Sequence, residues 1–120
     1  MTDSRALLLV LDSREPEQLA QFYAALLGGA EIQVQPDLAH LRVVQPQGVQ
    51  LLIRRNEQMV PPVWPQAGAT GPEIRLAVAD VDAAEREIVS LGGQPLDIES
   101  EDSTRTFADP EGHPFALAEW

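Results

Sequence analysis

Very few side chains in this sequence could act as a nucleophile, a base or a metal ligand. Histidine occurs only as His40 and His113, cysteine is absent, and all eight basic residues are Arg. These absences exclude thiol nucleophiles, thiolate-bound zinc and Schiff bases formed by lysine. His113 follows Pro110 and Gly112 in a predicted turn, where we expect its ring to bond local backbone. His40 lies in a predicted half-exposed strand, so neither histidine is expected to lead a catalytic site.

Composition limits both the class of protein and its partners. The chain has 120 residues, 44% hydrophobic side chains and a net charge of −11, with 10 Pro and 8 Gly. That length suits one domain, and the Pro and Gly content suits short elements joined by tight turns. An acidic surface repels phosphate, so binding to nucleic acid or to an anionic membrane is not expected. The apolar run Ala6–Leu11 is too short for a signal sequence or a membrane span, which predicts a cytoplasmic protein.

The sequence contains a diverged internal repeat. Leu27-Gly28-Gly29 recurs 64 residues later as Leu91-Gly92-Gly93. At the same spacing, Gln45-Pro46-Gln47-Gly48 recurs as Asp109-Pro110-Glu111-Gly112. Two matches in one order and at one spacing are not expected by chance. We therefore predict one domain over residues 1–120, built from two related modules at about 1–58 and 72–120 and joined by a linker over 59–71.

Each half predicts a strand, a helix and three more strands. In the first half, Leu19, Phe22, Tyr23 and Leu26 form a stripe at the helical period, which Gly28-Gly29 ends with left-handed backbone. Pro16 suits the first turn of that helix. The first half has its predicted helix at 17–27 and its strands at 6–12, 30–35, 40–44 and 49–54; the second half has its helix at 82–91 and its strands at 73–78, 94–99, 104–108 and 114–119.

Several of these segments resemble those of the vicinal oxygen chelate superfamily. The resemblance is carried by the repeated element order, by Gln21–Gly28 (QFYAALLG) after the first strand, and by Phe107–Phe115 (FADPEGHPF) before the last. Val60–Pro65 and Val81–Glu85 are similar to its small bacterial glyoxalase-like subfamily. This superfamily contains glyoxalase I, bleomycin- and fosfomycin-resistance proteins and extradiol dioxygenases.

The resemblance implies both a fold and a place for a metal. The fold is α+β, with two tandem βαβββ modules whose curled mixed sheets form a cup and whose helices lie on the convex side. Members that use a metal take one ligand, usually His or Glu, from the first and from the last strand of each module. Carried over to this chain, the four positions are Leu8, Leu52, Glu73 and Ala116. Only one of them has a donor atom, so we expect a degenerate site with no metal and no other cofactor.

Strand alternation predicts which other side chains face the cup. In one reading, Arg75 and Glu73 pair with each other or with Asp12 across strands, as structure only. In the other reading, these charges and the guanidinium of Arg54 orient a small, flat, anionic or strongly polar ligand. The predicted ligand-binding set is Asp12, Leu52, Arg54, Trp64, Glu73, Arg75 and Ala116.

The two tryptophans have separate predicted roles. Trp64 lies in a Pro-rich loop, from which it either covers the cup and stacks on a ligand or fills the interface between the modules. Trp120 is predicted to pack or to contact a second copy of the chain rather than to line the site. We expect a homodimer, the commonest symmetric assembly. The sequence leaves open whether the cup is completed within one chain or between two.

The missing metal ligands favour a function in binding. We expect a glyoxalase- and bleomycin-resistance-like protein that binds, and possesses the means to sequester, a small polar or aromatic compound. The alternative is a glyoxalase-like enzyme, a lyase or isomerase. Such an enzyme would use Glu73 as an acid or base, or a remodelled metal site, because an apolar cup raises the pKa of a lone carboxyl group.

Overall fold

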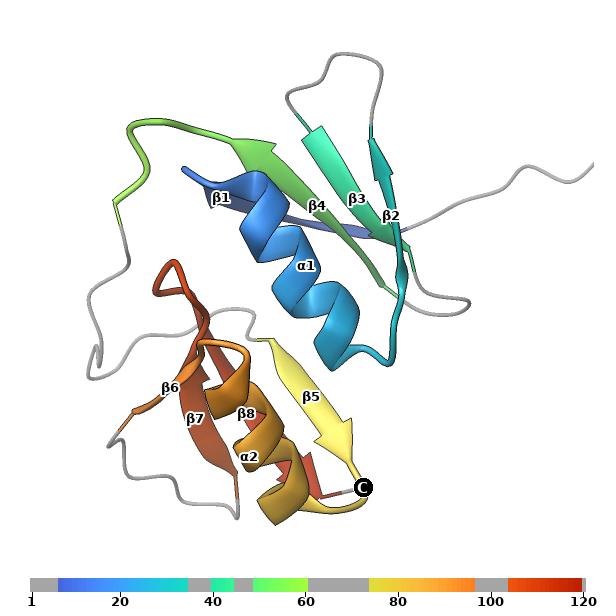
Figure 1. The fold of residues 1–120 in the computed structure, drawn as a ribbon, viewed down its shortest axis with the longest axis vertical. Helices are drawn as coiled ribbons and strands as arrows, with labels where there is room; N and C mark the ends of the chain where they lie inside the picture. The colour runs from blue at the N-terminus through green and yellow to red at the C-terminus, as the bar shows by residue number, and fades with distance from the viewer. Residues whose placement is uncertain (1–6, 35–39, 45–48, 61–73, 97–103, 120) are drawn as a thin grey trace, which may run out of the picture. The chain divides into compact units, whose positions relative to one another are not determined.

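The computed structural model of this chain describes residues 7–34, 40–44, 49–60, 74–96 and 104–119. The chain divides into two compact units, Met1–Met59 and Val60–Trp120 (Figure 1). Trp64, Glu73 and Trp120, which the sequence singles out, lie outside the described residues. Within the described ranges, no helix has the length and apolar character needed to cross a membrane.

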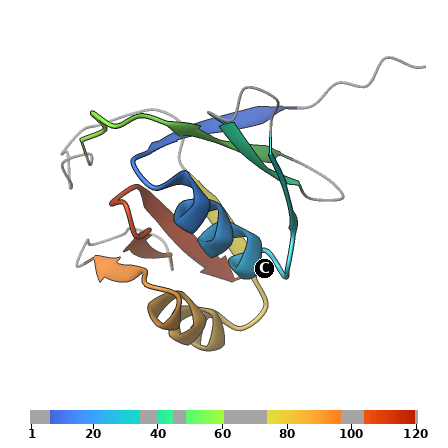
Figure 2. The same cartoon turned by 45° about the horizontal axis from the view of Figure 1, so that its top comes forward.

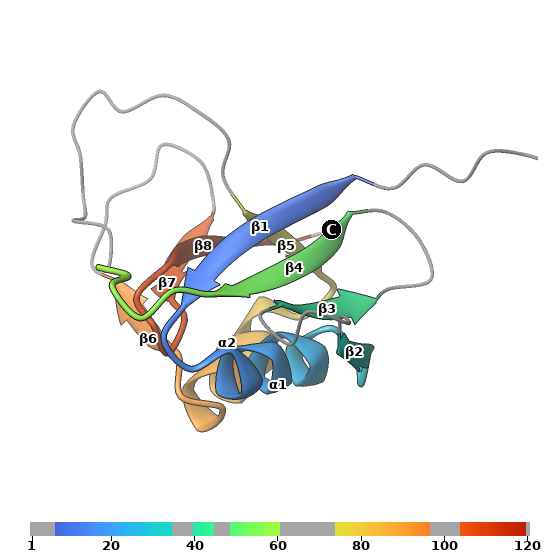
Figure 3. The same ribbon diagram turned by 90° about the horizontal axis from the view of Figure 1, so that it is seen from above.

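The first unit is a four-stranded mixed sheet with one helix. Its strands follow the order β1-β4-β3-β2, in which β1 is parallel to β4 and the other neighbours are antiparallel. Figure 3 shows β1 and β4 side by side. The helix α1 packs against all four strands, so the sheet has one face toward the helix and one open face. The elements are β1 (Leu8–Ser13), α1 (Pro16–Leu26), β2 (Glu31–Val34), β3 (His40–Val44) and β4 (Gln50–Arg55).

The second unit repeats this topology. Its strand order is β5-β8-β7-β6, again with the first and last strands of the unit parallel. The helix α2 packs against β6 and β8 (Figure 2). The predicted α+β class and the twofold βαβββ order are thus confirmed. The elements are β5 (Arg75–Val78), α2 (Val81–Ser90), β6 (Gln94–Leu96), β7 (Arg105–Ala108) and β8 (Pro114–Glu119).

Local sequence explains where α1 begins and ends. Pro16 opens the helix, at the position where a missing N–H costs nothing. Leu19 and Phe22 are buried against the sheet, as the helical stripe predicts. Gly28 and Gly29 then take positive φ values of 82° and 84°, and the Gly29 N–H donates to the carbonyl of Ala24 at 2.8 Å. The glycine pair therefore ends the helix, one residue earlier than the predicted Leu27.

The second helix is held at its start and on its outer side. The carboxylate of Asp80 accepts a hydrogen bond from the Ala83 N–H at 3.0 Å, a standard N-cap. Arg105 of β7 forms ion pairs with Asp82 at 2.9 Å and Glu85 at 3.3 Å. The hydrogen bond to Asp82 raises the pKa of Arg105 above its ordinary value. These contacts tie α2 to its sheet at the surface, while Ile88 does so in the core.

The spacing of the repeat changes by one residue inside the helices. Before the helices it is 65, since Val10 pairs with Leu52 in β1–β4 as Arg75 pairs with Ala116 in β5–β8. From the helix ends onward it is 64, and β8 matches the last six-residue strand of the first unit exactly. The cause is that α1 has 11 residues and α2 has 10. The 64-residue spacing found in the sequence therefore holds only after the helices.

Strand alternation sorts the side chains of each sheet into two faces. In unit two, Phe107 and Phe115 lie on the face toward α2, with stacked rings 5.9 Å apart. In unit one, the face toward α1 carries the buried side chains of Leu11, Ser13, Leu41, Val43, Leu51 and Ile53. The predicted inward and outward alternation is therefore present in both sheets.

Gly93 gives a direct test of how closely α2 approaches its sheet. A Cβ atom on this residue would lie 2.5 Å from Cγ2 of Ile88 and 3.3 Å from the carbonyl oxygen of Ala108. We expect Gly93→Ala to lower the free energy of unfolding by about 1–3 kcal/mol, the usual cost of overpacking. Chemical denaturation followed by circular dichroism measures this.

The control is Gly29→Asn. Nothing lies within 4 Å of a Cβ at Gly29, and Asn tolerates left-handed backbone better than other side chains. This variant should lose less stability than Gly93→Ala. An equal or larger loss would contradict the proposed close contact.

Candidate functional site

The open face of the first sheet gathers most of the predicted site residues that the structure describes. Leu8, Val10 and Asp12 of β1 lie on it, beside Leu52 and Arg54 of β4. Val10 and Leu52 are direct partners in the register, as are Asp12 and Arg54. Leu8 and Val10 are 40% and 42% exposed. The face is therefore apolar along β1, with charge at one end.

Asp12 and Arg54 bind each other. The Nε of Arg54 donates to Oδ1 of Asp12 at 2.6 Å, and the side-chain amide of Asn56 donates to Oδ2 at 3.1 Å. The hydrogen bond and the charge of Asp12 raise the pKa of Arg54 above its ordinary value. Both side chains are partly solvated, so the pair adds little stability. Its effect is to occupy the guanidinium that the sequence analysis assigned to a ligand.

Arg42 is the site residue that the sequence analysis missed. It lies on β3 between Gln33 of β2 and Leu52 of β4 in the register, on the open face. Its Nε is buried and has no hydrogen-bond partner. An unpaired buried donor costs about 1–3 kcal/mol, and more when the group is charged. The signal was available, because an Arg between the apolar Leu41 and Val43 must face away from the helix.

The second unit supplies a small apolar patch on its own open face. Ala116 of β8 lies between Arg75 of β5 and Thr106 of β7 in the register. Arg75 is exposed and Ala116 is buried. Glu73 and Trp64, the other predicted site residues of this half, lie outside the described residues.

The positions assigned to metal ligands carry hydrocarbon side chains. Leu8 and Leu52 share the open face of the first sheet, and Ala116 lies on that of the second. The 65-residue spacing before the helices is the one that relates Leu8 to Glu73. Among the described residues, no three His, Asp or Glu side chains lie close enough together to hold a metal ion. The described positions therefore do not fit a divalent cation.

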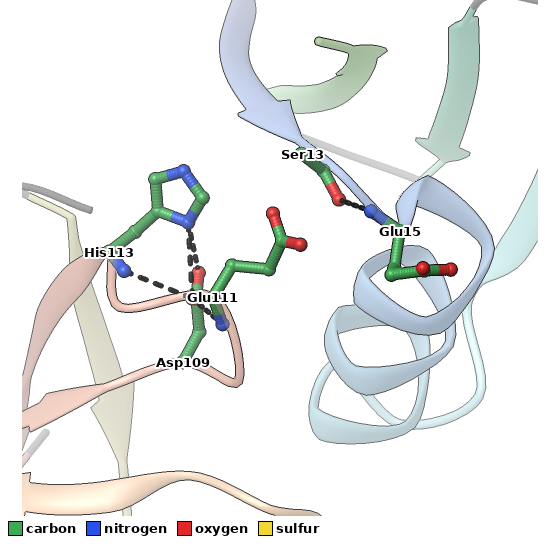
Figure 4. A network of polar contacts seen from close by, with 5 residues as sticks. All are labelled: Ser13, Glu15, Asp109, Glu111 and His113. Atoms are coloured by element: carbon green, nitrogen blue, oxygen red, sulfur yellow. Dashed lines mark hydrogen bonds and ion pairs between the residues drawn. The ribbon is translucent and has the colours of Figure 1, made fainter. Parts of the chain in front are cut away.

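The turn between β7 and β8 is organised by Asp109, not by His113. The buried carboxylate of Asp109 accepts hydrogen bonds from the backbone N–H of Glu111 at 2.9 Å and of His113 at 3.0 Å (Figure 4). The Nδ1 of His113 lies 2.8 Å from the same carboxylate. The His113 ring thus bonds a side chain where a backbone group was expected. Its partner gives it a structural role that sets the start of β8.

A second polar contact sets the start of α1. The hydroxyl of Ser13 is fully buried and accepts a hydrogen bond from the Glu15 N–H at 2.9 Å (Figure 4). The Ser13 carbonyl accepts from the Asn56 N–H at 2.9 Å. The chain therefore turns from β1 into α1 at a fixed point, next to the Asp12 carboxylate. His40 begins β3 opposite Arg54 in the register.

The chain is similar in sequence to one family model and in fold to several solved structures. A model described as a glyoxalase-like domain matches residues 8–118. No curated protein matches the sequence.

Three solved structures illustrate the likeness. A hypothetical protein from S. aureus is 22% identical, with 98% of this chain and 93% of that chain covered and a TM-score of 0.67. A glyoxalase/bleomycin resistance protein/dioxygenase family enzyme from Burkholderia phytofirmans is 12% identical, with 93% and 95% covered and a TM-score of 0.68. A glyoxalase/dioxygenase from Nostoc punctiforme is 17% identical, with 96% and 90% covered and a TM-score of 0.64. At these identities the structures establish the fold alone.

The Asp109 turn yields a stability prediction. Asp109→Asn replaces a carboxylate oxygen with an amide that cannot accept all three N–H bonds. We expect it to lower the free energy of unfolding by about 1–3 kcal/mol, because a buried donor is left unpaired. Asp82→Asn is the matched control, since Asp82 is an exposed acid whose ion pair with Arg105 is solvated. If both variants unfolded at the same denaturant concentration, Asp109 would not organise the turn.

Proposed function

This chain belongs to the glyoxalase-like domain family, and from that premise we propose that it binds a small molecule without a catalytic metal. In this role it sequesters a small polar or aromatic compound rather than transforming it. The observation that carries the proposal is the chemistry of the family's ligand positions. Leu8, Leu52 and Ala116 have no lone pair to offer a cation.

One remaining carboxylate cannot replace such a set. Stabilising an enediolate on a metal requires several protein ligands and an open coordination position. In this chain Glu73 alone would face competition from water at every other position. A loss of the metal while the surrounding fold is kept favours binding over lyase or isomerase chemistry. Fold by itself licenses neither, since one fold hosts many activities.

The open faces support a ligand of mixed character. Apolar side chains on β1 and β4 offer contact area, and arginines at their borders offer donors. Pockets for small molecules typically combine these two features. Homodimer formation and a cytoplasmic location stay parts of the proposal. The proposed contact residues are those of the sequence analysis, Asp12, Leu52, Arg54, Trp64, Glu73, Arg75 and Ala116, together with Arg42.

The first prediction from this proposal concerns metal content. After dialysis, elemental analysis should find substoichiometric nickel, zinc, manganese and iron. A variant combining Leu8→His, Leu52→Glu and Ala116→Glu restores donors at the family's positions, and we expect it to retain more metal than the wild type. Stoichiometric metal in the wild type that disappears in Glu73→Ala would overturn the proposal and favour the enzyme alternative.

A second prediction concerns the bound molecule. Native mass spectrometry of freshly purified protein should reveal a low-mass adduct that denaturation removes. Leu52→Asp places a carboxylate in the middle of the open face and should abolish the adduct. The control is Val34→Asp, the same kind of change at an exposed position of the same sheet, outside the open face. Loss of the adduct in both variants, or in neither, would argue against a site on this face.

A further inference from the structure

We infer that the open face of the first sheet binds an amphiphilic anion that carries a single carboxylate on an apolar body. The carboxylate binds Arg42, and the apolar body lies over Leu52 and Val10. This inference rests on the proposed binding function and names the class of ligand.

Arg42 demands an acceptor that the described residues of its own unit do not supply. Its Nε is buried and unpartnered, although a guanidinium is always charged. The nearest candidates on the same face are acids at its two edges. Asp12 is already bound by Arg54 and Asn56, and Glu31 at the other edge forms no ion pair with Arg42 in the described structure. An anion from outside the unit would satisfy the donor.

The neighbours of Arg42 define the shape of the ligand. Gln33, Arg42, Leu52 and Val10 follow one another across four strands in direct register. Adjacent strands lie about 4.8 Å apart, so roughly 10 Å of sheet separates the Arg42 and Val10 backbones. The row ends on Val10, which is 42% exposed, beside Leu8 at 40%. A row with a cation at one end and uncovered hydrocarbon at the other matches a bicyclic aromatic acid in length and character.

Charge limits the ligand to one negative group. The chain carries a net charge of −11, and Asp12 lies one row away from Leu52 on the same face. A second anionic group placed over the apolar row would approach that carboxylate and be repelled. The amide of Gln33 offers the carboxylate of the ligand a second, neutral donor instead.

The test uses 2-naphthoate and its neutral isostere 2-naphthamide as probes, with affinities measured by isothermal titration calorimetry. Wild-type protein, dialysed after unfolding and refolding to remove any resident ligand, should bind the acid about tenfold or more tightly than the amide, as expected for a charge-assisted hydrogen bond. Arg42→Gln should bind both probes equally. Arg54→Gln, the same change on the same face at a guanidinium already bound by Asp12, should keep the preference for the acid. Val10→Thr should weaken both probes by a similar factor.

The outcomes separate this inference from the proposed function. Equal binding of acid and amide by the wild type would overturn the inference while leaving a small-molecule site in place. A preference that survives in Arg42→Gln would do the same, and thermal denaturation would verify that the variant is folded. Binding of neither probe by the wild type, together with the absence of a native adduct, would overturn both proposals. The wild-type comparison needs no variant, so the inference is testable even if Arg42→Gln does not fold.

Discussion

Parallel pairing of the first and last strands is the constraint on which each unit depends. Once β1 lies beside β4 in parallel register, the period of two in a strand decides which side chains meet the helix and which face away. The same holds for β5 and β8. A helix on one face then leaves the other face free of its own unit's core. The candidate site in each unit is therefore a consequence of strand pairing and needs no special loop.

Two arginines on one face illustrate how position decides availability. Arg54 and Arg42 lie on neighbouring strands of the first sheet, and both project from the open face. Arg54 is adjacent to an acid in the register and is bound by it, whereas the direct neighbours of Arg42 are an amide and a leucine. Composition treats the two as equivalent cations. Only the register separates a structural ion pair from a donor that lacks an acceptor.

The sequence predicted local features well and cross-strand relations less well. The ranges of β3 and β8 match their predictions exactly, and Gly28-Gly29 ends the first helix as expected, because a single residue type dictates each turn. The partner of Asp12 was predicted as Glu73 or Arg75 but is Arg54. Arg42 was missed for the same reason: both depend on the register between β3, β4 and β1, which local patterns do not encode.

The one-residue difference in length between α1 and α2 marks where this architecture accepts change. In the body of a helix each residue adds a rotation of about 100°, so a deletion there would turn the apolar stripe off the sheet. A deletion within a strand would exchange its two faces. The difference falls instead near the start of the helix, where neither phase is disturbed. After a duplication, the two halves could therefore drift in length at this junction while their pairing geometry was inherited intact.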